Sequence, residues 1–239
     1  MKAKAAVTLH DPRGASPRRR RRLRWVIAGV VVLVLLIIGG IAAFIEQPAP
    51  APLRLPARAA AAPAGQLAGT WQVATGSLAG FRVRESALGF GNDVVGRTSA
   101  VTGTIVLAGD TVTSARLTVG LTAIRVDGKT EKQLVSSLAT ARYPDATFTL
   151  SHSVALSPAF AAGATIRLAA AGVLSMHGIS QPVTVILAGR RSGATLQVAG
   201  TIQVTFARWH IAGPGGLGFL GSLASNGIAE FLIILHRAG

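Results

Sequence analysis

The chain has 239 residues, no cysteine and a net charge of +15. The lack of cysteine excludes disulfides, a thiol nucleophile and a lipidated cysteine, so stability must come from an ordinary hydrophobic core. Residues 1–24 carry nine basic side chains and one acidic side chain, so about half of the charge lies in a short N-terminal tail. This distribution marks membrane topology and argues against a nucleic-acid-binding face.

An apolar run from Trp25 to Ile45 follows this tail and contains no charged residue over its 21 positions. As a helix it would span about 31 Å, which matches a hydrocarbon core of about 30 Å. The cluster Arg18–Arg22 and Arg24 precedes it and favours a cytoplasmic N-terminus. We therefore predict a cytoplasmic tail (1–24), a single transmembrane helix (25–45) and an extracytoplasmic remainder of the chain. A cleaved signal peptide is the alternative, because small residues at positions 49, 51, 57 and 59 would permit cleavage.

Residues 46–66 contain five prolines among many alanines. Proline fixes φ and lacks a backbone donor, so this stretch is expected to be an extended, semi-rigid linker. Fully extended, it would hold the following domain as far as about 60 Å from the bilayer.

Residues 67–239 form the predicted folded domain, in which apolar and polar residues alternate in strand-sized segments. On one such segment Ala115, Leu117 and Val119 alternate with polar residues or glycine, which is typical of half-buried strands. Turn residues separate the segments at Gly109-Asp110, His177-Gly178 and Ser192-Gly193. The eight or nine predicted strands are 70–73, 78–85, 98–107, 112–121, 146–156, 165–174, 182–190, 195–206 and 228–236.

One segment departs from the strand pattern. Residues Thr130 to Gln133 match a capping box, and Leu134, Val135 and Leu138 would share one side of the turns that follow. This pattern predicts a single short helix in a crossover. Many antiparallel strands with one helix favour a closed up-and-down β-barrel, and a barrel of about eight strands can hold one small ligand.

Catalytic signatures are mostly missing from the sequence. The histidines have no metal-site spacing, and no serine lies in a G-x-S-x-G motif. Residues 213–218 fit G-x-G-x-x-G formally but lack a βαβ context, so a loop is the better interpretation. His177 precedes Gly178 in a turn between two strands, where a structural role is favoured over a catalytic one. We therefore expect no enzyme activity, no metal and no cofactor other than a bound lipid.

Several stretches together resemble the YceI-like family of bacterial exported polyisoprenoid-binding proteins. The resemblance covers the whole predicted domain, with motifs in the same order and spacing as in the family. These stretches are GTWQV (69–73), LAGFRVR (78–84), VTGTI (101–105), ARYPDATF (141–148), LSMHGISQPV (174–183) and FARWHI (206–211).

This resemblance implies an extended, lipocalin-like antiparallel β-barrel whose apolar interior takes up a long isoprenoid chain. A long apolar tail needs a tunnel lined by alternate strand residues. The ligand-lining candidates are Phe81, Val83, Leu117, Val119, Leu121, Phe148, Leu168, Val204, Phe206 and Trp209, with Phe219 and Leu220 as residues that could close a mouth.

The sequence thus predicts an all-β domain behind a transmembrane helix, in a single-pass protein of the cell membrane. Its predicted function is to sequester or present an isoprenoid lipid, such as a quinone or polyprenyl carrier, without chemistry. Its expected partners are this lipid and the membrane, with no nucleic acid, and a homodimer is left open. The alternatives are a structural envelope barrel without ligand, a non-catalytic partner of a membrane redox or lipid enzyme, and an enzyme that uses His177 or His210 as an acid–base group.

Overall fold

The structure, a computed structural model, describes residues 29–36, 39, 49–57, 62–63, 65–87, 90–211 and 221–239. The chain divides into two compact units, Met1–Pro48 and Ala49–Gly239. In the first unit, residues 29–36 are helical. No helix within the described residues has both the length and the apolar character needed to cross a membrane. The predicted tail and most of the predicted span lie outside the described residues.

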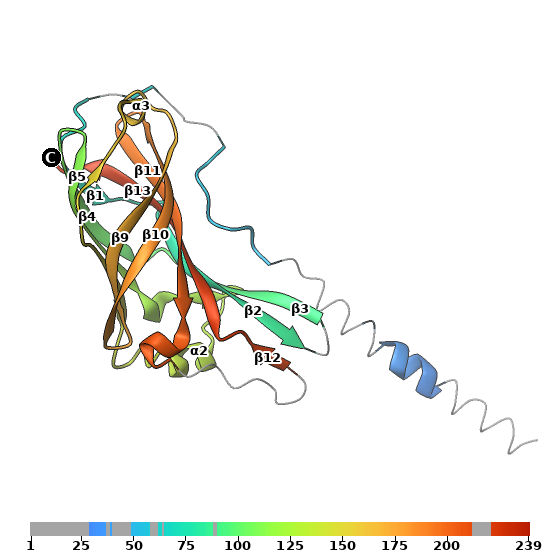
Figure 1. Cartoon of the computed structure of the whole chain (residues 1–239). Coiled ribbons are helices and arrows are strands. Elements are labelled where there is room, and N and C mark those ends of the chain that lie inside the picture. Colours follow the sequence, from blue (N-terminus) through green and yellow to red (C-terminus); the bar gives the residue numbers. More distant parts are fainter. Residues whose placement is uncertain are drawn as a thin grey trace, which may run out of the picture. The chain divides into compact units, whose positions relative to one another are not determined.

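The second unit is an antiparallel β-barrel, as predicted (Figure 1). Among the described residues, eight strands follow one another around it in the order β1-β4-β5-β7-β9-β10-β11-β13, and β13 pairs with β1 to close the ring. The eight strands are β1 (Gly69–Val73), β4 (Val101–Ala108), β5 (Thr111–Gly120), β7 (Asp145–Leu150), β9 (Ile166–Met176), β10 (Ile179–Ser192), β11 (Thr195–Thr205) and β13 (Asn226–Arg237).

The ring is not the whole sheet, because β13 changes its partner along its length. Its C-terminal part pairs with β1, whereas residues 228–232 pair with β2 (Leu78–Ala87). Strand β2 pairs in turn with β3 (Phe90–Thr98), which pairs with β6 (Arg125–Val126). The short β12 (Gly221–Leu223) also pairs with β2, and β8 (Val154–Ala155) pairs with β5. The β2–β3 hairpin therefore extends beyond the closed ring (Figure 1).

Strand β3 was not predicted, and two predicted strands end earlier than expected. Gly91, Asn92, Asp93 and Gly96 interrupt any apolar alternation in β3, which becomes a strand because it pairs with β2 along its whole length. Leu121 and Phe206 begin short 3-10 helices, η1 (Leu121–Ala123) and η2 (Phe206–Trp209), instead of ending strands. The predicted strand 146–156 is divided into β7 and β8.

The predicted helix exists as α2 (Lys132–Ser137), but its predicted capping box is wrong. The helix begins one residue later than expected, with Glu131 at the N-cap position and no side-chain capping bond. Thr130 therefore does not occupy the position from which a hydroxyl caps the first turn. A second short helix, α3 (Pro158–Ala161), was not predicted and begins with proline in its first turn.

The β9–β10 hairpin turns at His177 and Gly178, as predicted. Both residues have positive φ, 52° and 74°, which is the requirement of a two-residue type I′ turn. This turn fixes the register in which Met176 pairs with Ile179. It also places the His177 side chain at one end of the barrel, beside η2.

Candidate functional site

The barrel interior contains two clusters of buried apolar side chains. The first surrounds Trp71, which is 1% exposed, and includes Leu196 and Leu235. The second surrounds Trp209, which is fully buried, and includes Val185 and Ile202. Phe231 packs against both clusters and joins them through the middle of the barrel.

Both tryptophans are held by backbone oxygens as well as by packing. Trp71 Nε1 donates to the carbonyl oxygen of Leu67 at 2.9 Å, and Trp209 Nε1 donates to that of Leu174 at 3.3 Å. A buried indole N–H without an acceptor would destabilise the fold, so these bonds allow the largest side chains to be wholly buried.

Between the two tryptophans, several inward-facing side chains are only partly buried. They belong to β5, β7, β10, β11 and β13 and pack against the buried clusters, yet part of each remains accessible. In a solidly packed interior such side chains would be enclosed on every side. The middle zone of the interior is therefore apolar, and its side chains are not fully enclosed. The residues concerned are Leu117, Val119, Phe148, Leu187, Val198 and Phe231.

Glycines opposite aromatic rings shape this zone. A Cβ on Gly172 would lie 2.2 Å from an atom of the Phe148 ring, and one on Gly200 would lie 2.7 Å from an atom of the Phe231 ring. Each ring therefore occupies the space that a neighbouring side chain would need. The glycines on the adjacent strands leave room for these rings.

Six of the predicted ligand-lining residues pack with the two interior clusters. Leu117 and Val119 pack against the first cluster, whereas Val204 and Trp209 belong to the second, against which Phe148 and Phe206 pack. The structure thus brings these six residues into the interior, and their contact with a ligand stays a prediction.

The remaining predicted lining residues have more varied positions. Val83 and Leu121 are buried, and Leu168 pairs with the inward-facing Leu187. Phe81 pairs with Ala229, which packs against the second cluster, so both share the inward face of the sheet. Phe219 and Leu220 lie outside the described residues.

The sequence-based selection missed inward-facing residues on strands that it had recognised. Leu187, Val198 and Phe231 share their strand faces with the buried Val185, Leu196 and Ile233. The period-two alternation marks Val185 and Leu187 on β10, whereas 228–235 is a nearly continuous apolar run that does not single out Phe231. Nothing in either pattern distinguishes a partly enclosed side chain from a fully buried one.

His177 has contacts that agree with the structural role favoured from the sequence. Its Nδ1 lies 2.8 Å from the carbonyl oxygen of Trp209, to which it donates a hydrogen bond. The Tyr143 ring meets the imidazole edge-on at 5.2 Å between centroids. These contacts tie the β9–β10 turn to η2 and hold Trp209 in place.

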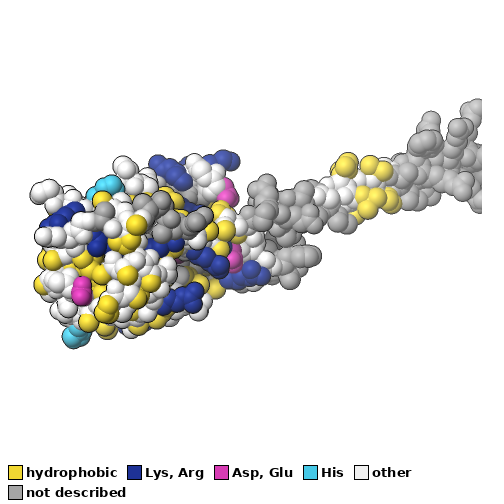
Figure 2. All heavy atoms as spheres, turned by 90° about the horizontal axis from the view of Figure 1, so that it is seen from above, with side chains coloured by type: hydrophobic (Ala, Val, Ile, Leu, Met, Phe, Trp, Pro, Cys, Tyr) yellow, Lys and Arg dark blue, Asp and Glu magenta, His cyan; other side chains and the backbone are white. Residues whose placement is uncertain are grey.

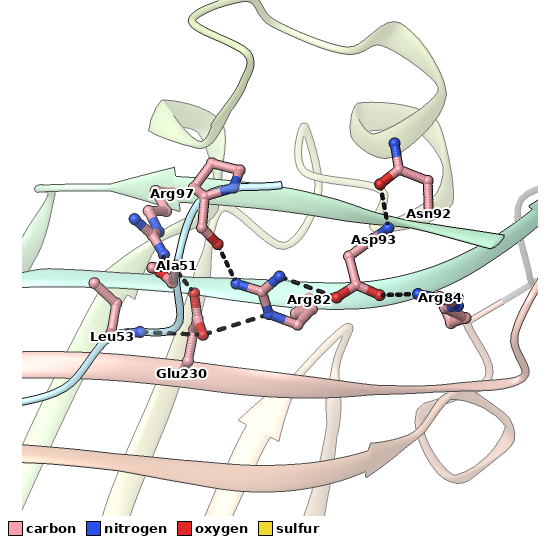
Figure 3. A network of polar contacts seen from close by, with 9 residues as sticks. Ala51, Leu53, Arg82, Arg84, Asn92, Asp93, Arg97 and Glu230 are labelled. Carbon is pink, nitrogen blue, oxygen red and sulfur yellow. Dashed lines mark hydrogen bonds and ion pairs between the residues drawn. The ribbon is translucent and has the colours of Figure 1, made fainter. Parts of the chain in front are cut away.

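Charged side chains gather on the outward face of β2, β3 and β13, where the sequence predicts no site. Glu230 is 2% exposed and accepts a hydrogen bond from Arg97 at 3.0 Å, and Arg82 Nε lies 3.8 Å from its other carboxylate oxygen (Figure 3). Glu230 is the one charge in the otherwise apolar run 228–235, which is the signal that could have identified it.

Asp93 extends this network toward the hairpin. It accepts from Arg82 at 3.1 Å and from the more exposed Arg84 at 3.3 Å (Figure 3). Three guanidinium groups thus share two carboxylates across neighbouring strands. The network pairs the buried Glu230 carboxylate with two guanidinium groups and links the side chains of β2, β3 and β13, although among the described residues Arg82 Nε and Arg97 Nε are buried without a hydrogen-bond partner.

No metal site is evident among the described residues, and no continuous basic surface is visible on the one face drawn in Figure 2. Within the described residues, no group of three or more histidine, aspartate or glutamate side chains is arranged to hold a metal ion. On the face drawn in Figure 2, lysine and arginine side chains lie in separate groups between apolar and uncharged residues.

Comparison with known proteins identifies the class of this barrel. The profile of the YceI-like domain family matches residues 71–228, so the chain belongs to that family. No curated protein sequence matches the chain.

Two solved structures are similar to this chain, and the first of them shows the likeness of the fold. A polyisoprenoid binding domain from Saccharophagus degradans, implicated in plant cell wall breakdown, is 18% identical, with a TM-score of 0.54. The match covers 72% of this chain and 99% of that domain. BcnA from Burkholderia cenocepacia is 17% identical over 64% of this chain and 95% of its own, with a TM-score of 0.46.

Proposed function

We propose that this protein is a membrane-anchored, extracytoplasmic binding protein that holds a long-chain isoprenoid lipid inside its barrel. The ligand class is a quinone or polyprenyl lipid, which the protein sequesters or presents without catalysing a reaction. Membership of the YceI-like family and the apolar interior support this proposal, as does the similarity in fold to a polyisoprenoid binding domain.

The observation that carries the proposal is the partly accessible row of inward side chains between Trp71 and Trp209. An isoprenoid tail consists of branched apolar units and needs only such a surface. Burying about 20 methylene-like groups at about 0.8 kcal/mol each gives a gross gain near 16 kcal/mol. Even after the cost of ordering the chain, micromolar or tighter binding follows without a specific polar contact.

We propose a function without catalysis because of the environments of His177 and His210, the two candidate acid–base residues. His177 is engaged by Trp209 and Tyr143 at the outer end of a turn. His210 follows η2 with φ of 51° and is exposed, away from the inward apolar side chains. Neither arrangement directs an imidazole toward a ligand in the middle zone.

Membrane anchoring is proposed from the sequence. The uncharged run Trp25–Ile45 behind an arginine cluster favours a single span with a cytoplasmic N-terminus. This topology would place the barrel outside the cytoplasm, beside the membrane that stores isoprenoid lipids.

The test is mass spectrometry of organic extracts from the full chain purified from its native membrane, with two matched variants. Leu187→Trp adds bulk to a partly accessible inward position, whereas Ile186→Trp adds the same bulk outside, where Ile186 is 59% exposed. We expect a stoichiometric isoprenoid or quinone in the wild type and in Ile186→Trp, and a marked loss in Leu187→Trp.

Both variants introduce tryptophan on the same strand and are purified in the same way. Lipid that adheres to the outside of the protein should therefore be present in equal amounts in both. Thermal melts without added lipid would show that both variants fold. Equal isoprenoid content in all three proteins, or none in any, would contradict binding inside the barrel. A lipid-free wild type would favour a structural envelope barrel.

A further inference from the structure

Part of the predicted linker lies against the barrel. Arg82 donates to the carbonyl oxygen of Pro50, and Arg97 donates to that of Ala51 (Figure 3). The backbone N–H of Leu53 donates to Glu230 at 3.4 Å. Residues Pro50–Leu53 (the strap) therefore cover the charged network on the outward face of β2, β3 and β13.

These contacts recognise the backbone of the strap. A proline-rich extended chain makes no internal hydrogen bonds, so its carbonyl oxygens are available to arginine donors. Pro52 has no backbone N–H. The next backbone N–H, that of Leu53, donates to the Glu230 carboxylate. The sequence of small residues and prolines suits this mode of binding because it presents backbone groups without bulky side chains.

The surface beneath the strap is built for close approach. Gly80 lies between Glu230 and Arg97, because it pairs with both of them across three strands. A Cβ at this position would lie 2.0 Å from the carbonyl oxygen of Gly96. Glycine thus leaves the two charged side chains free to meet above it, where the strap covers them.

The far end of the predicted linker is also held. The carbonyl oxygen of Gly65 accepts from Arg191, and Leu67 is buried in the first core cluster. A Cβ on Gly163 would lie 2.8 Å from an atom of Pro63, so this proline is packed close to the loop after α3. Both ends of residues 50–67 therefore belong to the folded unit that contains the barrel.

We propose that the strap is a docked part of the barrel domain, and that it shortens the tether of the barrel to the membrane. The proposal rests on the proposed membrane anchor. Only residues 46–49 then separate the predicted span from the first docked residue, and four residues reach no more than about 14 Å. The fully extended linker would reach about 60 Å, so docking decides whether the barrel works at the bilayer surface or well away from it.

Limited trypsin digestion of the full chain tests the docking, because Arg54 follows the strap directly and is exposed. A protease must bind several residues in an extended and free conformation, so a docked strap protects the bond after Arg54. Leu53→Pro removes the N–H that binds Glu230, and Leu53→Ala retains it. Arg97→Ala removes the donor to Ala51 from the barrel side, and Arg84→Ala is its control because Arg84 has no contact with the strap among its hydrogen bonds.

Cleavage after Arg54, followed by mass spectrometry, is normalised to the rate in each heat-unfolded chain. We expect Leu53→Pro and Arg97→Ala to be cut about tenfold faster than the wild type, since each loses a charge-assisted hydrogen bond. Leu53→Ala and Arg84→Ala should resemble the wild type. Equal normalised rates in all five proteins would overturn the proposal.

The result is independent of lipid binding. The strap lies on the outward face, so the isoprenoid content of organic extracts should be unchanged in the strap variants. Failure of the docking proposal would therefore leave the proposed binding function standing, and the absence of lipid would leave the digestion result unaffected.

Discussion

The molecule buries large side chains in two regions by different means. In the barrel interior, Trp71 and Trp209 are enclosed by apolar residues from many strands, with one backbone acceptor for each indole. On the outward face, Glu230 is enclosed by two arginines and by the strap. The inward side chains are enclosed by the strands of the barrel, whereas Glu230 on the outward face is also contacted by a segment distant in the sequence. The two regions should therefore respond differently to substitution.

The largest effect is expected from Trp209→Ala, which would break the interior region. Removing a fully buried indole leaves a cavity and should lower the free energy of unfolding by about 3–5 kcal/mol. Urea unfolding followed by circular dichroism would measure the change. Trp209→Phe, which keeps a ring and loses the bond to Leu174, should cost clearly less. If Trp209→Ala and Trp209→Phe lowered the free energy of unfolding equally, the hydrogen bond to Leu174, and not the packing of the ring, would stabilise this part of the barrel.

A somewhat smaller effect is expected from Gly80→Ala, which tests the close approach beneath the outward network. The added Cβ would meet the backbone of Gly96 and force the β2–β3 pairing to shift, at a cost of about 3 kcal/mol. A lower melting temperature of Gly80→Ala than of the wild type would show this loss of stability. Gly109→Ala is a control for the added methyl group, because no atom lies within 4 Å of a Cβ there, although its φ of 59° adds local strain. A Gly80→Ala melting temperature at or above that of Gly109→Ala would contradict the crowding argument.

Glu230→Ala should destabilise the protein by about 2 kcal/mol, by leaving Arg82 and Arg97 without their shared carboxylate. Breaking a fully buried pair costs about 3–5 kcal/mol, but the two arginine side chains here are 13% and 27% exposed and water can reach them. Glu230→Gln retains an oxygen acceptor and should cost less. If Glu230→Ala and Glu230→Gln had the same melting temperature as the wild type, the charged network would contribute nothing to stability. The proposed difference between the interior and the outward region would then be wrong.

The smallest effect is expected from Arg84→Ala, at about 0.5 kcal/mol or less. Arg84 is 60% exposed and pairs only with Asp93, which keeps its bond to Arg82. Raising the salt concentration should reduce the difference further, because exposed ion pairs are screened. A cost as large as that of Glu230→Ala would show that the network acts as one unit out to the hairpin.

The barrel was largely predictable from local pattern. Strand-sized segments in the sequence predicted nine strands, which correspond to β2 and the eight strands of the ring, and His177-Gly178 predicted a hairpin turn that the structure confirms. The longest strand that was not predicted, β3, contains Gly91, Asn92, Asp93 and Gly96 and has little strand character of its own; the short β6 and β12 were not predicted either. Segment β3 is a strand because β2 offers it a complete set of backbone partners, and pairing with a neighbouring strand is not visible in a local window.

The interior site was predictable in part. Six of the predicted lining residues pack with the interior clusters, since inward parity follows from the alternation. The degree of enclosure was not predictable, because Leu187 and Val185 lie on the same face of β10 and differ only in what other strands place against them.

The sequence by itself indicated which side chains face the inside on the strands that alternate, such as β5 and β10, because the period of a strand is local and assigns each residue to one face. It also marked the apolar run, the arginine cluster and the proline-rich composition of the linker, which depend only on residue type. The tertiary structure alone decided that Glu230 is buried and that Pro50–Leu53 lies against Arg82 and Arg97. These residues are 32 to 177 positions apart, and only the closed sheet brings them together.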